Sequence, residues 1–145
     1  MTAPLPSGAQ AARAMRCALS EAGVAPEAIG YVNAHASSTP LNVVSETLAI
    51  KQVFGKHAYR VPISGTKAMH GHALAATGAI EAAVYMLAFR HTYLPPTINL
   101  EEPDPDCALD YIPRHGRELA ADYILSNSFG FGGINASLVF GQAPV

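Results

Sequence analysis

The sequence predicts an α/β protein in which a parallel or mixed sheet carries helices on its faces. Through most of the chain, segments with apolar residues at helical spacing alternate with short apolar runs, an order typical of strands joined by helices. Proline and glycine mark the boundaries between these segments. Two further apolar runs near the end, joined by the glycine-rich turn 128–133, add two strands.

The chain begins with a Pro/Gly/Ser-rich segment, residues 1–7, which predicts a connector ahead of one domain over residues 8–143. Ser7 is expected to cap the first helix, which ends at Gly23. The later helices are expected at 43–54 and 71–90, and the strands at 29–34, 60–64, 109–112, 123–127 and 134–140. The stretch 91–100 is extended and rich in proline, and an acidic loop follows it at 101–108.

Spacing also indicates which side chains enter the core. Leu48, Ile50 and Val53 are the candidate core positions of the second helix, and Cys17 is read as a small core residue of the first. The other cysteine, Cys107, falls in the acidic loop. The two cysteines lack the spacing of a metal site or a redox pair.

The amino-acid composition limits the kinds of partner and cellular location that we expect for this chain. The chain has 145 residues, of which 50% are apolar and 14% charged, so we expect a single domain with part of its surface covered by another subunit. The formal net charge is −2 and basic residues do not cluster, which excludes a nucleic-acid partner. Because the sequence has neither a membrane-spanning apolar run nor a leader, we expect a cytoplasmic protein without membrane contact.

The stretch from Gly65 to Glu81 places polar chemistry at a junction between a strand and an apolar helix. It contains Lys67, His72 and Glu81. Burying a lysine and a glutamate is costly unless the two form a pair, so this pattern indicates a site, with Glu81 neutralising Lys67. The alternative is that Lys67 reaches solvent.

A second histidine, His35, also follows a predicted strand. Because sites in open α/β sheets gather at the carboxyl ends of strands, His35, His72 and Lys67 are expected to form one proton-donating cluster. Each histidine alone could instead be an ordinary loop residue. Ser37 and Thr39 could bind an amide-bearing ligand or cap the next turn. No role is assigned to His70, and the remaining histidines are read as surface residues, namely His57, His91 and His115.

The glycine-rich turn around Phe129, Phe131 and Gly132 lacks the following helix that a dinucleotide-binding loop requires. We read it as a mobile loop that swings Phe131 and offers a backbone N–H to an anion. The alternative is an ordinary flexible hairpin.

Five segments in order together resemble the C-terminal half of a β-ketoacyl-acyl-carrier-protein synthase of the two-histidine branch. They are Tyr31–Pro40 with His35, Ser64–His72 with Lys67, Gly78–Glu81, Pro95–Leu100 and Asn127–Asn135. The resemblance covers nearly the whole chain. It implies a thiolase-like half-domain, with a mixed five-stranded sheet and helices on both faces. It also implies decarboxylative condensation of malonyl-acyl carrier protein with an acyl thioester.

The resemblance further implies residue roles. His35 and His72 would bind the malonyl thioester oxygen, and Lys67 would pair with Glu81. The N–H of Phe131 would form half of an oxyanion hole and its ring would gate the acyl pocket. The phosphopantetheine arm of acyl carrier protein would be bound by four residues, namely Ser37, Thr39, Phe129 and Gly132. The implied partners are acyl carrier protein, an N-terminal half and further subunits in a homo- or hetero-oligomer. No metal or tightly bound cofactor is implied.

Three residues depart from the family pattern. Val43 stands where the family usually has Asp, and Ala36 and Ala75 stand where it usually has Gly. In addition, neither cysteine lies in a nucleophile motif. The segment 1–4 resembles an internal stretch of the full enzyme. We therefore expect a half-domain that is catalytic only with a nucleophile-bearing half. The alternatives are a non-catalytic subunit that resembles a chain-length factor, or an inactive fragment.

Overall fold

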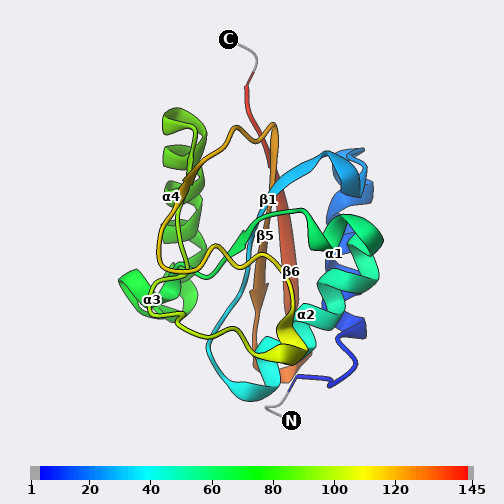
Figure 1. Ribbon diagram of the computed structural model, residues 1–145. Coiled ribbons are helices and arrows are strands. Elements are labelled where there is room, and N and C mark those ends of the chain that lie inside the picture. Colours follow the sequence, from blue (N-terminus) through cyan, green and yellow to red (C-terminus); the bar gives the residue numbers. More distant parts are fainter. Residues whose placement is uncertain (1–3, 144–145) are drawn as a thin grey trace.

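A four-stranded mixed sheet of order β2-β1-β5-β6 forms the centre of the fold in the computed structural model, which describes residues 4–143 (Figure 1). Strand β1 lies parallel to β2 and β5, whereas β5 and β6 are antiparallel. The strands are β1 (Ile29–Asn33), β2 (Ile63–Ser64), β5 (Tyr123–Phe129) and β6 (Asn135–Gly141). A separate antiparallel pair joins β3 (Tyr93–Leu94) to β4 (Arg117–Glu118). The predicted mixed sheet is confirmed, with four strands in the described main sheet where five were expected.

Helices cover both faces of this sheet, as predicted (Figure 1). Helices α1 (Ala9–Ala22) and α2 (Pro40–Phe54) pack on one face, and α4 (Thr77–His91) packs on the other. Successive strand residues point to opposite faces. Val32 therefore joins the core under α1 and α2, while its neighbour Tyr31 joins the core under α4. Leu125 and Ile124 divide in the same way.

The start of α1 corrects the predicted cap. Gly8 occupies the N-cap position with φ 67°, and a Cβ there would meet the carbonyl oxygen of Ser45 at 2.3 Å. Glycine is thus required where α1 crosses α2. The Ser7 hydroxyl accepts only a long hydrogen bond, 3.4 Å, from the Ala9 N–H. Of the predicted connector, residues 4–7 are exposed and residues 1–3 lie outside the described part.

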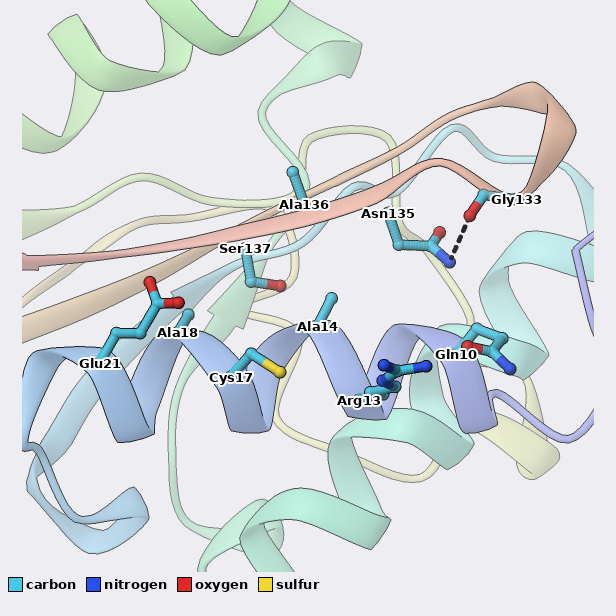
Figure 2. Close-up of a pocket in the computed structure, with 10 residues that line it drawn as sticks. All are labelled: Gln10, Arg13, Ala14, Cys17, Ala18, Glu21, Gly133, Asn135, Ala136 and Ser137. Atoms are coloured by element: carbon cyan, nitrogen blue, oxygen red, sulfur yellow. Dashed lines mark hydrogen bonds between the residues drawn. The ribbon is translucent and has the colours of Figure 1, made fainter.

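Cys17 is exposed, so its assignment to the core was wrong. Met15 and Leu19 of the same helix are buried instead. Cys17 lines a hollow of about 360 Å³ between α1 and β6. Figure 2 shows it there with Arg13 and Ser137, which also line the hollow. Leu48 is likewise 38% exposed, whereas Ile50 is buried and Val53 is half-buried as expected.

The predicted helix 71–90 begins later, at Thr77. Before it come the short helix α3 (Lys67–His70), a loop and the 3₁₀ turn η3 (Leu74–Ala76). Gly71 and Leu74 have positive φ values of 77° and 50°, which break the helical path. Although the apolar sequence of α4 predicted burial, Met86 and Leu87 are more than half exposed, because only one side of the helix faces the sheet.

Two other predictions were wrong. Residues 109–112 were predicted to form a strand, but they form a loop. In this loop, Asp110 makes hydrogen bonds to two other parts of the chain. Its carbonyl oxygen accepts the N–H of Ile63 at 2.8 Å, and its carboxylate forms a two-bonded ion pair with Arg117. His57 is half-buried, not solvent-facing, with Nε2 2.9 Å from the carbonyl oxygen of Ile29.

Three further 3₁₀ turns join these elements, namely η1 (Pro26–Ala28), η4 (Pro105–Cys107) and η5 (Phe131–Gly133). A longer one, η2 (Gly55–Tyr59), follows α2. Within residues 4–143, none of the helices has the length and apolar character needed to cross a bilayer.

Candidate active site

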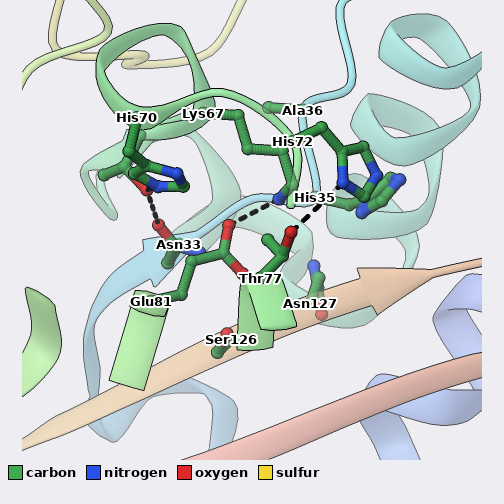
Figure 3. Close-up of polar contacts among 12 residues, drawn as sticks. Asn33, His35, Ala36, Lys67, His70, His72, Thr77, Glu81, Ser126 and Asn127 are labelled. Carbon is green, nitrogen blue, oxygen red and sulfur yellow. Dashed lines mark hydrogen bonds and ion pairs between the residues drawn. The ribbon is translucent and has the colours of Figure 1, made fainter. Parts of the chain in front are cut away.

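The two predicted histidines meet at the carboxyl ends of the parallel strands (Figure 3). The ring centroids of His35 and His72 lie 5.6 Å apart, with the ring planes at 80°. His35 is 7% exposed, and its ring is also 5.7 Å from that of Phe129. His72 lies in the exposed loop between α3 and α4. The segment after β1 and the loop between α3 and α4 thus bring the two imidazoles together.

Glu46 of α2 holds the backbone that carries His35. Its Oε1 accepts the N–H of His35 at 2.8 Å, and its Oε2 accepts the N–H of Ala36 at 3.0 Å. Asn127 of β5 donates to Oε1 at 3.1 Å and Asn42 donates to Oε2 at 3.3 Å. Burial raises the pKa of Glu46, and the hydrogen bonds from Ala36, His35 and Asn127 oppose that rise.

This role of Glu46 is not evident from the sequence. The available signal was a single glutamate in α2, eleven positions after His35 and flanked by Ser45 and Thr47. Only the fold shows which backbone groups it binds.

The electrostatic surroundings of His35 favour its neutral form. Burial is the main cause of a pKa lowered to about 4, and the nearby Lys67 and His72 lower it further. A neutral imidazole can donate one hydrogen bond and accept another. His35 Nδ1 is buried without a hydrogen-bond partner in the described part of the chain.

Hydrogen bonding fixes the tautomer of His72. The backbone N–H of Leu74, which can only donate, points at Nδ1 from 3.1 Å. Nδ1 must therefore accept, and in the neutral ring the proton lies on Nε2. The hydroxyl oxygen of Thr77 is also 3.1 Å from Nδ1, so it too acts as a donor there.

Lys67 and Glu81 form a buried ion pair, with 2.5 Å between Nζ and Oε1. The Lys67 side chain is 6% exposed and that of Glu81 is fully buried. The alternative in which Lys67 reaches solvent is thereby excluded. Glu81 Oε2 has no hydrogen-bond partner among the described residues.

Beneath the ion pair lies a layer of buried polar side chains that the sequence analysis missed. Asn33 of β1 donates to the Tyr85 hydroxyl at 3.0 Å, and the Thr66 hydroxyl donates to Asn33 Oδ1 at 3.3 Å. The Tyr85 hydroxyl also shares a hydrogen bond with Ser126 of β5. These bonds tie α4 to two strands. These contacts could be predicted only if the order of the strands were known, because they join polar residues of β1 and β5 to a tyrosine of α4.

The remaining predicted residues surround this centre less closely. Ser37 and Thr39 lie in the loop after His35, with their hydroxyl oxygens 3.3 Å apart. Thr39 occupies the N-cap position of α2, but its side chain makes no capping bond. Phe131 is 77% exposed in the turn between β5 and β6, and Gly132 of that turn has φ 78°. Among residues 4–143, no three His, Cys, Asp or Glu side chains cluster in a way that would hold a metal ion.

Comparisons with known proteins show the family to which this chain belongs. The family model described as Beta-ketoacyl synthase, C-terminal domain, matches residues 1–101. The 3-oxoacyl-(acyl-carrier-protein) synthase 2 of Synechocystis sp. is 53% identical over 97% of this chain, and that of Coxiella burnetii is 48% identical over 98%. In both cases the match covers 34% of the relative, so the chain spans about a third of the length of these curated relatives.

Solved structures give the same result for the fold. A complex of a type II polyketide synthase acyl-carrier protein with its ketosynthase has a TM-score of 0.96 at 42% identity, covering 99% of this chain and 35% of the other. A beta-ketoacyl synthase from Burkholderia phymatum has a TM-score of 0.89 at 43% identity, covering 96% and 34%. The thiolase-like ketosynthase fold expected from the sequence is therefore confirmed.

Proposed function

This chain belongs to the beta-ketoacyl synthase family as its C-terminal domain, and we propose that it supplies the two-histidine half of a 3-oxoacyl-(acyl-carrier-protein) synthase. The observation that supports the proposal most directly is the pair of imidazoles, 5.6 Å apart. His72 has Nδ1 occupied by donors and therefore presents Nε2–H outward. Two such donors directed at one oxygen stabilise negative charge as it develops.

The reaction assigned to this pair is decarboxylation of a malonyl thioester. The bond between the α-carbon and the carboxylate breaks, carbon dioxide leaves, and the electron pair moves onto the thioester oxygen as an enolate. His35 and His72 donate to that oxygen. The low pKa of His35, about 4, keeps the ring neutral near pH 7, so no proton is transferred in this step.

Condensation follows from the enolate. Its α-carbon attacks the carbonyl of the acyl thioester held on a cysteine, and the thiolate leaves as the new carbon–carbon bond forms. We assign the cysteine to a separate N-terminal half, because Cys17 is an exposed residue of α1 and Cys107 is a buried residue of η4, and neither element carries a histidine of the pair. The Phe131 N–H would contribute to the oxyanion hole for this second step, with its ring gating the acyl pocket.

The carrier and its arm complete the proposal. The substrate would arrive on the phosphopantetheine arm of an acyl carrier protein, a partner that one structural relative binds. Ser37 and Thr39 offer two neighbouring hydroxyls for the amides of that arm, next to His35 in the chain. The ring of Phe129 lies 5.7 Å from that of His35. Phe129 and Gly132 would line the channel through which the thioester reaches the histidines.

The N-terminal half would cover the apolar surface that this chain exposes. Six large side chains contribute to that surface, namely Leu74, Met86, Leu87, Phe131, Ile134 and Leu138. Each is more than half exposed, and several lie on α4 or beside the histidine loop. Apolar patches of this kind mark protein interfaces.

The test is decarboxylation of malonyl-acyl carrier protein by this chain, by a cysteine-bearing N-terminal half of a relative, and by their mixture. Carbon dioxide release in the mixture alone would support the proposal. A second candidate, a non-catalytic subunit, is favoured by the likeness to an ishigamide ketosynthase/chain length factor structure, with a TM-score of 0.92 at 38% identity. It predicts that the mixture forms a complex without gaining activity.

A further inference from the structure

Helix α4 carries three buried polar side chains in one line, and each holds a different part of the candidate site. Thr77 contacts His72, Glu81 pairs with Lys67, and Tyr85 binds Asn33 and Ser126. Residues four apart lie on the same side of a helix, about one turn from each other. The line therefore spans from the exposed histidine loop to the interior of the sheet.

The two donors to His72 Nδ1 differ in how firmly they are held. Leu74 is 78% exposed and adopts φ 50°, a left-handed conformation that is unfavourable for a residue with a side chain. Thr77 is 4% exposed and is the first residue of a helix anchored by Glu81 and Tyr85. The Thr77 hydroxyl is buried and is hydrogen-bonded to His72, so breaking this bond would leave a buried polar group unpaired, which is unfavourable.

We propose that Thr77 is a positioning residue for His72, in that its hydroxyl holds the ring from a rigid helix in the orientation in which the Leu74 N–H reaches Nδ1 and sets the tautomer. The proposal extends the function proposed above, because it explains how an exposed histidine keeps one orientation. It also implies that one helix sets both His72 and Lys67, through side chains one turn apart. The placement of the histidine would then follow α4 and not its own loop.

The first measurement uses ¹⁵N-histidine-labelled full chain and reads the ring nitrogen chemical shifts of His72, assigned with His72→Gln. The measurement is made at a pH well above about 6.5, the approximate pKa of an unperturbed histidine side chain, so that the tautomers of the neutral ring are compared. We expect wild type and Thr77→Ser to show a single Nε2–H tautomer. Thr77→Val, of nearly equal shape, removes the hydroxyl, so the His72 ring can turn away from the Leu74 N–H. The two nitrogen shifts should then move toward each other, as exchange between tautomers does.

Thr47→Val is the matched control. Thr47 is also a buried helical threonine with hydrogen-bonded hydroxyl, but it lies on α2 and contacts Val43 and Tyr111. The Thr47→Val variant should leave the ring nitrogen chemical shifts of His72 unchanged. If Thr77→Val does not fold by circular dichroism, Thr77→Ala repeats the measurement, since alanine suits a helix. Wild-type His72 shifts in a folded Thr77→Val or Thr77→Ala variant would overturn the proposal.

A second measurement tests the consequence for catalysis and depends on the proposed function. In the mixture with the N-terminal half, Thr77→Val should lower kcat for decarboxylation about five- to tenfold with KM unchanged, and Thr77→Ser should restore it. An inactive wild-type mixture would contradict the proposed function alone. The nitrogen shifts would still decide the role of Thr77.

Discussion

The Glu46 carboxylate accepts the backbone N–H of His35 at 2.8 Å, so a side chain from α2 determines where the chain leaves β1. Ala36, the next residue, donates to the other oxygen and has φ 42°. A charged acceptor with two oxygens suits two adjacent N–H groups, and a left-handed residue brings both to the same side. The loop that carries His35 is thus held by the Glu46 carboxylate.

Glu46→Gln should destabilise the chain by about 1–3 kcal/mol, because the amide places an NH₂ group against one of the two N–H donors and leaves it buried and unpaired. The free energy of unfolding from urea titration measures this loss. Glu21→Gln, an exposed substitution on α1, is the control and should change stability by less than about 0.5 kcal/mol. Equal stabilities for the two variants would contradict the role given to Glu46.

The stability of the chain should fall as the pH drops from about 6.5 toward 4, in part because of His35. Its folded pKa is about 4, below the unfolded value of 6.5, so the unfolded chain binds more protons in this window. The stabilisation is complete above the unfolded pKa and is lost as the pH falls toward the folded one.

Urea titrations of wild type and His35→Gln across this pH range measure the His35 contribution. The pH-dependent difference should reach about 1–2 kcal/mol, less than the full linkage value because water screens part of the site. His91→Gln, at an exposed position, should keep the wild-type dependence. If the free energy of unfolding changed with pH in the same way for wild type and His35→Gln, the lowered pKa assigned to His35 would be refuted.

Removing one member of the buried ion pair should cost more than removing both. Lys67→Met leaves the Glu81 carboxylate buried without its partner, and Glu81→Met leaves the ammonium in the same condition, so each should lower the free energy of unfolding by about 3–5 kcal/mol. The double variant Lys67→Met/Glu81→Met should recover much of this loss. Additive losses in this double-mutant cycle would mean that the two groups do not stabilise each other.

His72→Ala in the mixture with an N-terminal half should abolish condensation while leaving acyl transfer to the partner's cysteine largely intact. The reason is that His72 is assigned to the enolate oxygen, which does not form during acyl transfer. Mass spectrometry of the acylated half measures transfer, and release of carbon dioxide measures decarboxylation. The contrary outcome is an equal loss of both steps.

The isolated chain should bind a hydrophobic dye strongly, because Met86, Leu87 and Leu138 are each more than half exposed. Adding the N-terminal half should reduce the fluorescence as the surface becomes covered. Weak dye fluorescence from a folded, monomeric chain would show that this surface is not a docking face.

Local sequence patterns were sufficient for much of the fold. Helical spacing and Gly23 located α1 and its end, and the apolar runs located β1, β5 and β6 within one or two residues of their observed bounds. Patterns failed where backbone conformation or long-range contact decided the outcome. The break at Gly71 and Leu74 interrupted an otherwise helical pattern, and the Asp110 bonds to Ile63 and Arg117 displaced the expected strand at 109–112.

The sequence by itself determined that Lys67, His72 and Glu81 lie at a strand-to-helix junction and that His35 follows another strand, because these facts depend on neighbours along the chain. Only the tertiary structure decided that Glu46 binds the His35 backbone and that Tyr85 joins two strands. Placing β5 between β1 and β6 brings Asn127 to Glu46 across 81 positions of sequence. Such a contact depends on the order of strands in space, which residue spacing does not encode.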